Sequence, residues 1–202
     1  MKILVENGIE ARNTLQAKAD SLPSHLGGHL NKTHNDRGTL LHLMDVYKIK
    51  SFLDVGCGPG GMVRIAKMRG LDSLGIDGDW TMATESEAKI TIHDFTTGPA
   101  PIDSDSLRIE FDLAWSVEFL EHVEEQYQDN YMQAFARCKY AVCTFGLGSS
   151  SKNSNSQNQE YWINVFNKYG FDYDAEETAL IRERSNMQKP FMQHTGMFFK
   201  RR

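Results

Sequence analysis

The chain has 202 residues and a formal net charge of −5 at pH 7. This length suits one domain with its own core and leaves no room for a second full domain. An acidic balance excludes a protein whose whole surface attracts nucleic acid, so a nucleic-acid partner would need a local basic patch.

The three cysteines, Cys57, Cys138 and Cys143, are an odd number, and they stand far apart or within apolar runs. They fit reduced core thiols better than a disulfide framework. No apolar run approaches the ~20 residues of a membrane span, and residues 1–5 are too short for the apolar part of a signal peptide. We therefore expect a soluble, cytoplasmic protein with no membrane partner.

The first 35 residues are predicted to form a separate extension. Residues 8–22 have loosely helical apolar spacing and end at Pro23, which predicts a short helix. Residues 24–34 contain three histidines, His25, His29 and His34. No cysteine or carboxylate cluster accompanies them, which favours a polar loop over a zinc site.

The rest of the chain alternates strand-like and helical segments. Strands are predicted at residues 52–55, 74–76, 90–93, 111–116 and 140–145, and helices at 36–47, 62–67, 130–136 and 161–169. Further strand material is predicted at residues 171–173, 178–184 and 191–199. Such alternation is typical of an α/β fold with a parallel sheet.

A glycine-rich turn, Gly-Cys-Gly-Pro-Gly-Gly at residues 56–61, follows the first strand. Glycines allow positive φ angles and close approach to a ligand, and the next helix offers free N–H groups.

About 20 residues later, Asp77 ends a strand where a doubly wound fold places a carboxylate for ribose hydroxyls. Asp77 and Gly78 also suit an ordinary turn. Trp80 suits either stacking on an adenine or a place in the core.

The run from Asp54 to Gly60 resembles the first motif of the class I S-adenosylmethionine-dependent methyltransferases, and further matches follow over residues 36–200. This resemblance implies a doubly wound, seven-stranded, mostly parallel sheet with helices on both faces and an antiparallel last strand. It implies a methyltransferase domain over residues 36–202 and a helical or lid-like extension over residues 1–35.

The resemblance also implies S-adenosylmethionine as the cofactor. In the family, the acidic residue that Asp94 matches accepts a hydrogen bond from the adenine amino group. The positions implied to bind the cofactor are Asp54, Gly56, Cys57, Gly58, Gly60, Asp77, Gly78, Trp80, His93, Asp94, Phe95 and Ser116.

The segment after the fourth strand resembles the Glu-x-x-Glu-His variant of the family's fourth-strand motif. Methyl transfer is an in-line displacement, and His122 suits removal of a hydroxyl proton, so Glu118 and His122 are the catalytic candidates. Glu118, Glu121 and His122 would share one helix face and are also metal-ligand candidates. They resemble sites in metal-dependent enzymes that methylate small-RNA 2′-hydroxyls or phenols. Alternatively, the carboxylates complement the helix dipole and His122 lines the cofactor pocket.

Two other features narrow the function. The motif differs from the Asn-Pro-Pro-Tyr motif of DNA amino-methyltransferases, which disfavours DNA as the acceptor. The polar residues 146–159 predict a loop or lid, but they lack the histidines that relatives often carry there.

We therefore expect O-methylation of a hydroxyl on a small molecule or sugar, with an RNA ribose as a further option. The alternatives are a cofactor-binding scaffold or partner subunit without catalysis, an NAD-dependent oxidoreductase, and another reaction that uses S-adenosylmethionine. The sequence leaves the acceptor and the oligomeric state open.

Overall fold

The computed structural model describes residues 22–23, 25–27, 32–81, 87–102, 111–146 and 154–202. Within these ranges, a seven-stranded sheet has the order β3-β2-β1-β4-β5-β7-β6. The strands are β1 Ser51–Val55, β2 Asp72–Asp77, β3 Ile90–Ile92, β4 Phe111–Ser116, β5 Cys138–Cys143, β6 Phe171–Tyr173 and β7 Met197–Arg201. Strands β1 to β5 pair in parallel, and β7 pairs antiparallel with β5 and β6. The predicted sheet is confirmed.

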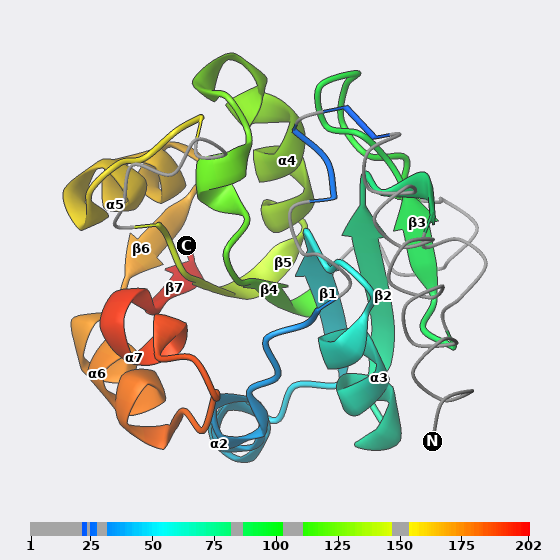
Figure 1. Cartoon of the computed structure of the whole chain (residues 1–202). Helices are drawn as coiled ribbons and strands as arrows, with labels where there is room; N and C mark the ends of the chain where they lie inside the picture. Colours follow the sequence, from blue (N-terminus) through cyan, green and yellow to red (C-terminus); the bar gives the residue numbers. More distant parts are fainter. Residues whose placement is uncertain (1–21, 24, 28–31, 82–86, 103–110, 147–153) are drawn as a thin grey trace, which may run out of the picture.

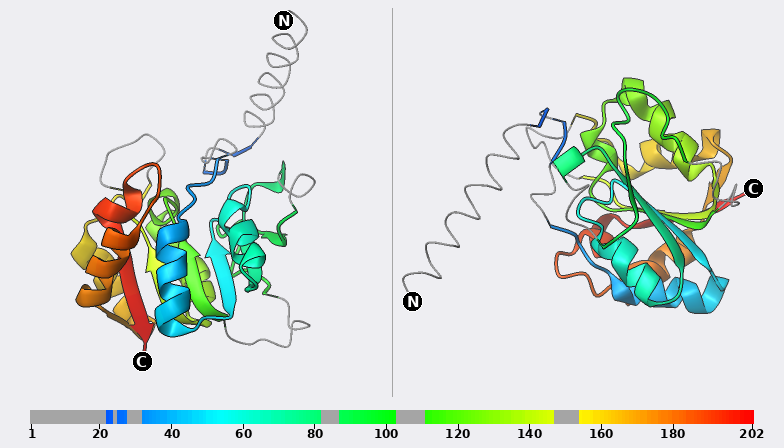
Figure 2. Two further views of the ribbon diagram at one scale, coloured as in Figure 1. Left: turned by 90° about the horizontal axis from the view of Figure 1, so that it is seen from below. Right: turned by 90° about the vertical axis from the view of Figure 1, so that its right-hand side faces the viewer.

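Helices cover both faces of this sheet (Figures 1 and 2). They are α2 Arg37–Tyr47, α3 Gly61–Met68, α4 Gln128–Phe135, α5 Gln159–Lys168, α6 Ala175–Arg184 and α7 Phe191–Thr195, with 3₁₀ turns η2 Leu120–His122 and η3 Glu125–Tyr127. In Figure 1, α4 and α5 lie above the sheet and the other α-helices below it. The predicted double-sided arrangement is therefore confirmed.

Each face of the sheet has its own hydrophobic core, as the alternation of side chains along a strand requires. On β1, Leu53 packs into the cluster beneath α4 and α5, whereas Phe52 packs into the cluster beneath α2, α3, α6 and α7. All five residues of β1 are buried, as expected of a central parallel strand. The three cysteines are also buried and free, so the prediction of reduced core thiols is confirmed.

The C-terminal region differs from its prediction. Residues 178–184, expected as a strand, belong to helix α6, and residues 191–195 form α7 before strand β7 begins. The reason for α6 is local: the Asp174 carboxylate accepts a hydrogen bond from the Glu177 N–H at 2.9 Å and caps the helix. Two helices thus lie between β6 and β7, where further strand material was predicted.

The sheet order brings the carboxyl ends of β1, β2 and β4 together, because β1 lies between the other two. The chain leaves β1 towards β2 on one side and returns to β4 on the other, which opens a crevice at this point in doubly wound folds. The predicted helix in residues 8–22 lies almost wholly outside the described residues. No helix of the described ranges has both the length and the apolar character needed to cross a membrane.

Candidate functional site

The glycine turn has the geometry that its sequence predicts. Gly56, Gly58 and Gly60 have φ angles of 76°, 51° and 71°, a region that favours glycine. A Cβ atom on Gly56 would lie only 2.2 Å from the Phe119 ring. The N–H groups of Gly56 and Cys57 donate to the Ile76 carbonyl, at 2.9 and 3.1 Å, which ties the turn to β2.

Asp77, at the end of β2, fastens the same turn. Its Oδ2 accepts a hydrogen bond from the Gly58 N–H at 2.7 Å, and its Oδ1 accepts one from the Asp79 N–H at 2.9 Å. The carboxylate therefore orders the backbone around it and also lines the neighbouring cavity.

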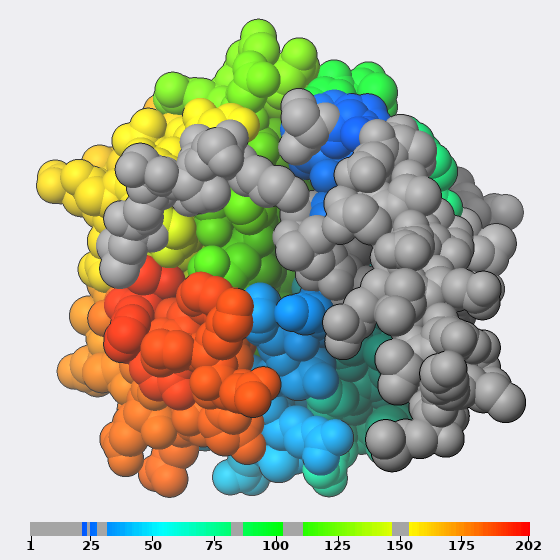
Figure 3. Space-filling model, viewed as in Figure 1, coloured from blue at the N-terminus to red at the C-terminus, as the bar shows by residue number. Residues whose placement is uncertain are grey.

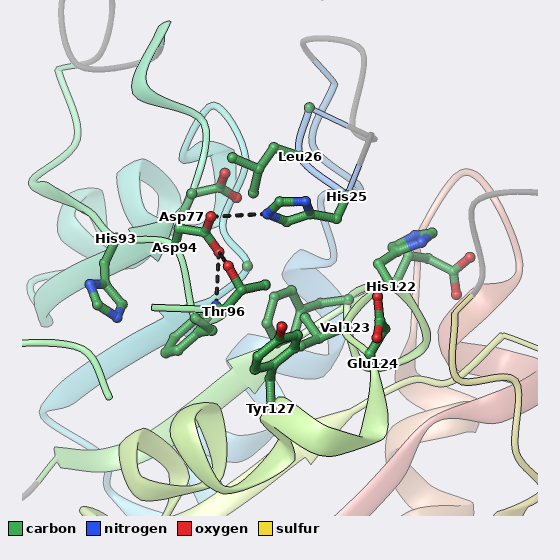
Figure 4. Close-up of a pocket in the computed structure, with 16 residues that line it drawn as sticks. His25, Leu26, Asp77, His93, Asp94, Thr96, His122, Val123, Glu124 and Tyr127 are labelled. Atoms are coloured by element: carbon green, nitrogen blue, oxygen red, sulfur yellow. Dashed lines mark hydrogen bonds and ion pairs between the residues drawn. The ribbon is translucent and has the colours of Figure 1, made fainter. Parts of the chain in front are cut away.

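A first cavity of about 210 Å³ lies beside Asp77, between the ends of β2, β3 and β4 (Figure 4). Its lining residues are His25, Leu26, Gly27, Gly56, Asp77, Gly78, His93, Asp94, Phe95, Thr96, Glu118, Phe119, His122, Val123, Glu124 and Tyr127. Its walls combine apolar and aromatic side chains with a few carboxylates, which suits a flat, polar-edged ligand.

Asp94 is held by hydrogen bonds on both of its oxygens. Its Oδ2 lies 2.9 Å from Nε2 of His25, and its Oδ1 accepts hydrogen bonds from the N–H and hydroxyl of Thr96. Burial by itself would raise the pKa of Asp94, but these hydrogen bonds hold it below its usual value. In Figure 4 His25 points across the cavity towards this carboxylate.

A second cavity of about 240 Å³ adjoins the first. Its lining residues are Lys32, Thr33, His34, Asp54, Gly56, Cys57, Gly58, Met62, Trp115, Val117, Glu118, His122 and Lys189. Asp54 is only 3% exposed, and burial, followed by the charge of Asp77, raises its pKa well above the usual value. The two cavities share Gly56, Glu118 and His122.

Glu118 and His122 thus come together as predicted, but Glu121 does not join them. Glu118 has a φ of 54°, and η2 is a 3₁₀ turn, so the predicted α-helical face does not form. Glu121 is 1% exposed and lines neither cavity. The described ranges hold no group of three or more His, Cys, Asp or Glu side chains placed for a metal ion.

Thr144 contacts both the backbone and the carboxyl group of Glu118. Its Oγ1 accepts a hydrogen bond from the Glu118 N–H at 2.9 Å and donates one to Glu118 Oε1 at 3.3 Å. Burial, reinforced by the charge of Glu121, raises the pKa of Glu118 to about 7, although Thr144, His122 and Lys189 oppose the shift. A carboxyl group with this pKa can both accept and release a proton near neutral pH.

Of the positions implied to bind the cofactor, most line a cavity: Asp54, Gly56, Cys57, Gly58, Asp77, Gly78, His93, Asp94 and Phe95. Gly60, Trp80 and Ser116 line neither. Gly60 is the N-cap of α3, and Trp80 is 48% exposed. The buried Ser116 hydroxyl donates to the Val55 carbonyl at 2.8 Å, so it joins β4 to β1.

Sequence reasoning missed part of both walls. His25 and Leu26 belong to the stretch that was predicted as a polar loop. Phe119 and Tyr127 do not occupy a fixed position of any motif. Lys189 lies in the loop that joins α6 to α7, and no spacing connects it with the glycine turn.

Comparison with known proteins supports this picture. Residues 53–141 match the model of a family described as a methyltransferase domain. A TehB-like S-adenosylmethionine-dependent methyltransferase from Corynebacterium glutamicum is 18% identical over 100% of both chains, with a TM-score of 0.57. No curated protein sequence matches the chain significantly.

Two further structures share the fold. The methyltransferase domain of a bacterial Hen1 protein is 15% identical over 81% of this chain and 95% of its own, with a TM-score of 0.53. Magnesium protoporphyrin IX methyltransferase from Synechocystis, solved with bound S-adenosylhomocysteine, is 12% identical over 79% of this chain and 78% of its own, with a TM-score of 0.52. At these identities the likeness shows the fold. Residues 53–141 thus match a methyltransferase domain, and the chain has the Rossmann-like fold of S-adenosylmethionine-dependent methyltransferases.

Proposed function

We propose that this methyltransferase transfers the methyl group to a hydroxyl oxygen of a small molecule or sugar. The observation that carries the proposal is that Glu118 and His122 line both cavities and stand where the two cavities meet. A group at this junction can touch cofactor and acceptor together, as a base for methyl transfer must.

The residues of the first cavity fit an adenosine. Asp77 suits the ribose hydroxyls and Asp94 the adenine amino group, while Phe95 and Phe119 supply apolar wall. A Cβ atom on Gly78 would lie 2.5 Å from Leu26, so this wall already closes tightly around the cavity. Beyond Gly56, the buried Asp54 suits the ammonium of the methionine part, whose positive charge would favour the ionised carboxylate.

When bound, S-adenosylmethionine supplies the electrophilic methyl group, and the protein has to orient the acceptor and take its proton. Thr144 engages Oε1 of Glu118, so Oε2 is the oxygen suited to accept the hydroxyl proton. His122 stands beside it as a second base or as a hydrogen-bond partner that orients the acceptor. Methyl transfer would form a C–O bond at the expense of the cofactor's C–S bond, and Glu118 or His122 would take up the hydroxyl proton.

The test measures formation of S-adenosylhomocysteine with matched panels of phenols, sugars and amines, with and without a chelator. We expect hydroxyl acceptors to be methylated, and Glu118→Gln and His122→Asn to lower turnover by the ~10²–10⁴-fold typical of general base catalysis. Affinity for S-adenosylhomocysteine should remain within about threefold of wild type, because the proposal assigns cofactor binding chiefly to other side chains. The matched control is Glu160→Gln on the exposed first turn of α5, which lines neither cavity.

Methylation restricted to amines, or full turnover in both variants, would contradict O-methylation with these residues as bases. Activity that falls with the chelator would bring back a metal-assisted route.

A further inference from the structure

One wall of the second cavity is basic. Lys32, His34 and Lys189, which we call the basic wall, line this cavity together with the glycine turn and Glu118. Lys32 and His34 precede α2, whereas Lys189 lies between α6 and α7. The wall therefore joins two segments that are far apart in the sequence.

Hydrogen bonds fasten these segments to each other. Asp36 Oδ2 accepts a hydrogen bond from the Ser185 hydroxyl at 2.6 Å, and its Oδ1 accepts one from the Asn186 N–H at 3.2 Å. The Gly38 N–H donates to Oδ1 of Asn186 at 2.9 Å. Figure 3 shows the orange surface of the α6–α7 region against the blue surface of the stretch around α2. The wall is thus anchored to the body of the domain.

The side chains of the wall share an aromatic support. The His34 ring meets the Phe191 ring edge-on, with 4.8 Å between centroids. The Lys189 ammonium lies 5.6 Å from the centroid of the same Phe191 ring, within the range of a cation–π contact. Thr33, between the two N-terminal members, accepts a hydrogen bond from the Gly61 N–H at 3.1 Å. These contacts hold the wall over the start of α3.

The wall is positively charged in an otherwise acidic protein. Within the part of the chain that the structure describes, neither Lys32 nor Lys189 forms an ion pair. Burial, then Lys189 and Lys32, lowers the pKa of His34. Both lysines are exposed, so they stand at the open side of the cavity beside the catalytic candidates, where two like charges attract an anion.

We propose that the basic wall binds an anionic group, a carboxylate or phosphate, of the methyl acceptor while Glu118 and His122 face its hydroxyl. This inference rests on the proposed function, because it names the acceptor class for the same site. The cofactor also carries one carboxylate, which has the same chemistry. Two lysines supply more positive charge than that single group needs, so we assign the wall to the acceptor.

The experiment separates these two sources. Calorimetry measures S-adenosylhomocysteine binding to wild type, Lys189→Gln, Lys32→Gln and the double variant. Each complex, saturated with S-adenosylhomocysteine, is then titrated with inorganic phosphate, with 4-hydroxybenzoate and with the neutral 4-hydroxybenzamide. Lys168→Gln is the matched control, since this lysine ends α5 and lines neither cavity.

We expect both anions to bind the wild-type complex, and 4-hydroxybenzoate to bind at least about tenfold more tightly than its amide. Lys189→Gln should weaken anion binding about tenfold, and the double variant should weaken it more. S-adenosylhomocysteine affinity should stay unchanged in these variants. The control variant Lys168→Gln should bind both anions as wild type does. A matching loss of S-adenosylhomocysteine affinity would assign the wall to the cofactor carboxylate and overturn the proposal. Absence of anion binding, or anion binding unchanged in the double variant, would also overturn it.

The outcome is distinguishable from failure of the proposed function. Lysine-dependent anion binding without methyl transfer to any hydroxyl would contradict O-methylation and leave the anion site in place. Methyl transfer to neutral hydroxyls, unaffected by the lysine variants, would support O-methylation and contradict the anion site.

Discussion

His25 and Asp94, which are 69 positions apart in the chain, meet with 2.9 Å between Nε2 and Oδ2 across the mouth of the first cavity. The contact joins the segment ahead of α2 to the corner after β3, where we propose that the adenine binds. The histidine therefore occupies an oxygen that the adenine amino group would use.

Removing this histidine should make cofactor binding slightly tighter. His25→Ala frees Oδ2 of Asp94, and an exposed ion pair is worth about 0–1 kcal/mol, so S-adenosylhomocysteine affinity should rise by at most about fivefold. Calorimetry checks this, with His194→Ala as the control because His194 lines neither cavity. A clear loss of affinity would instead make His25 part of the cofactor site.

Asp77 should contribute strongly to cofactor binding. Asp77→Ala should weaken S-adenosylhomocysteine binding by about 1.5–3 kcal/mol, the range for a hydrogen bond to a charged group. Because Asp77 also orders Gly58 and Asp79, thermal unfolding must show that the variant is folded. The conservative Asp77→Asn keeps an oxygen acceptor and should lose less. If affinity does not change in a folded Asp77→Ala protein, Asp77 lies outside the site.

Glu121 should make the protein less stable at high pH. Burial raises its pKa to about 7, and its Oε2 is buried without a hydrogen-bond partner in the described residues. Between about pH 4.5 and 7 the folded state binds more protons than the unfolded state, so stability falls as pH rises through this window. The full effect for one such group is on the order of 3 kcal/mol.

Glu121→Gln should therefore raise the melting temperature at pH 8 more than at pH 5. Thermal unfolding at both pH values checks this, with the exposed Glu183→Gln as the control. An equal change at both pH values would show that the ionisation of Glu121 does not matter for stability.

The pH dependence of turnover should report Glu118. With its pKa raised to about 7, a catalytic base gives a rate that rises with pH and levels off above that value. Lys189 lowers the pKa of Glu118, so Lys189→Gln should move the rising limb to higher pH. If the rate of Glu118→Gln still rises with pH near 7, a group other than Glu118 accepts the proton.

Much of the fold could be predicted from the sequence because buried strands and capped helices have local signals. The predicted strand at 111–116 and the predicted helix at 36–47 are both present, the helix with Asp36 as its N-cap. Helix α6 was missed because its hydrophobic pattern is weak: of its ten residues, only Glu177, Thr178 and Ile181 are buried. Its cap at Asp174 was the available signal.

The candidate site, too, could be predicted from the sequence only in part. Asp77 ends β2 and Asp94 follows β3, so the family motif and the sheet topology predicted where they lie. His25 and Lys189 reach the cavities through contacts between distant segments, such as the pairing of Asp36 with Ser185. Local spacing carries no information on such contacts. Glu121 turned inward because η2 is a 3₁₀ turn, which changes the direction of each side chain relative to an α-helix.

Calorimetric titration of the purified chain with S-adenosylmethionine, S-adenosylhomocysteine and NAD tests the central claim most directly. The site described here predicts micromolar binding of both sulfur nucleotides, no binding of NAD, and a marked loss of binding of the first two in Asp94→Ala. Binding of NAD, or no heat with any of the three, would contradict a cofactor site formed by the glycine turn, Asp77 and Asp94.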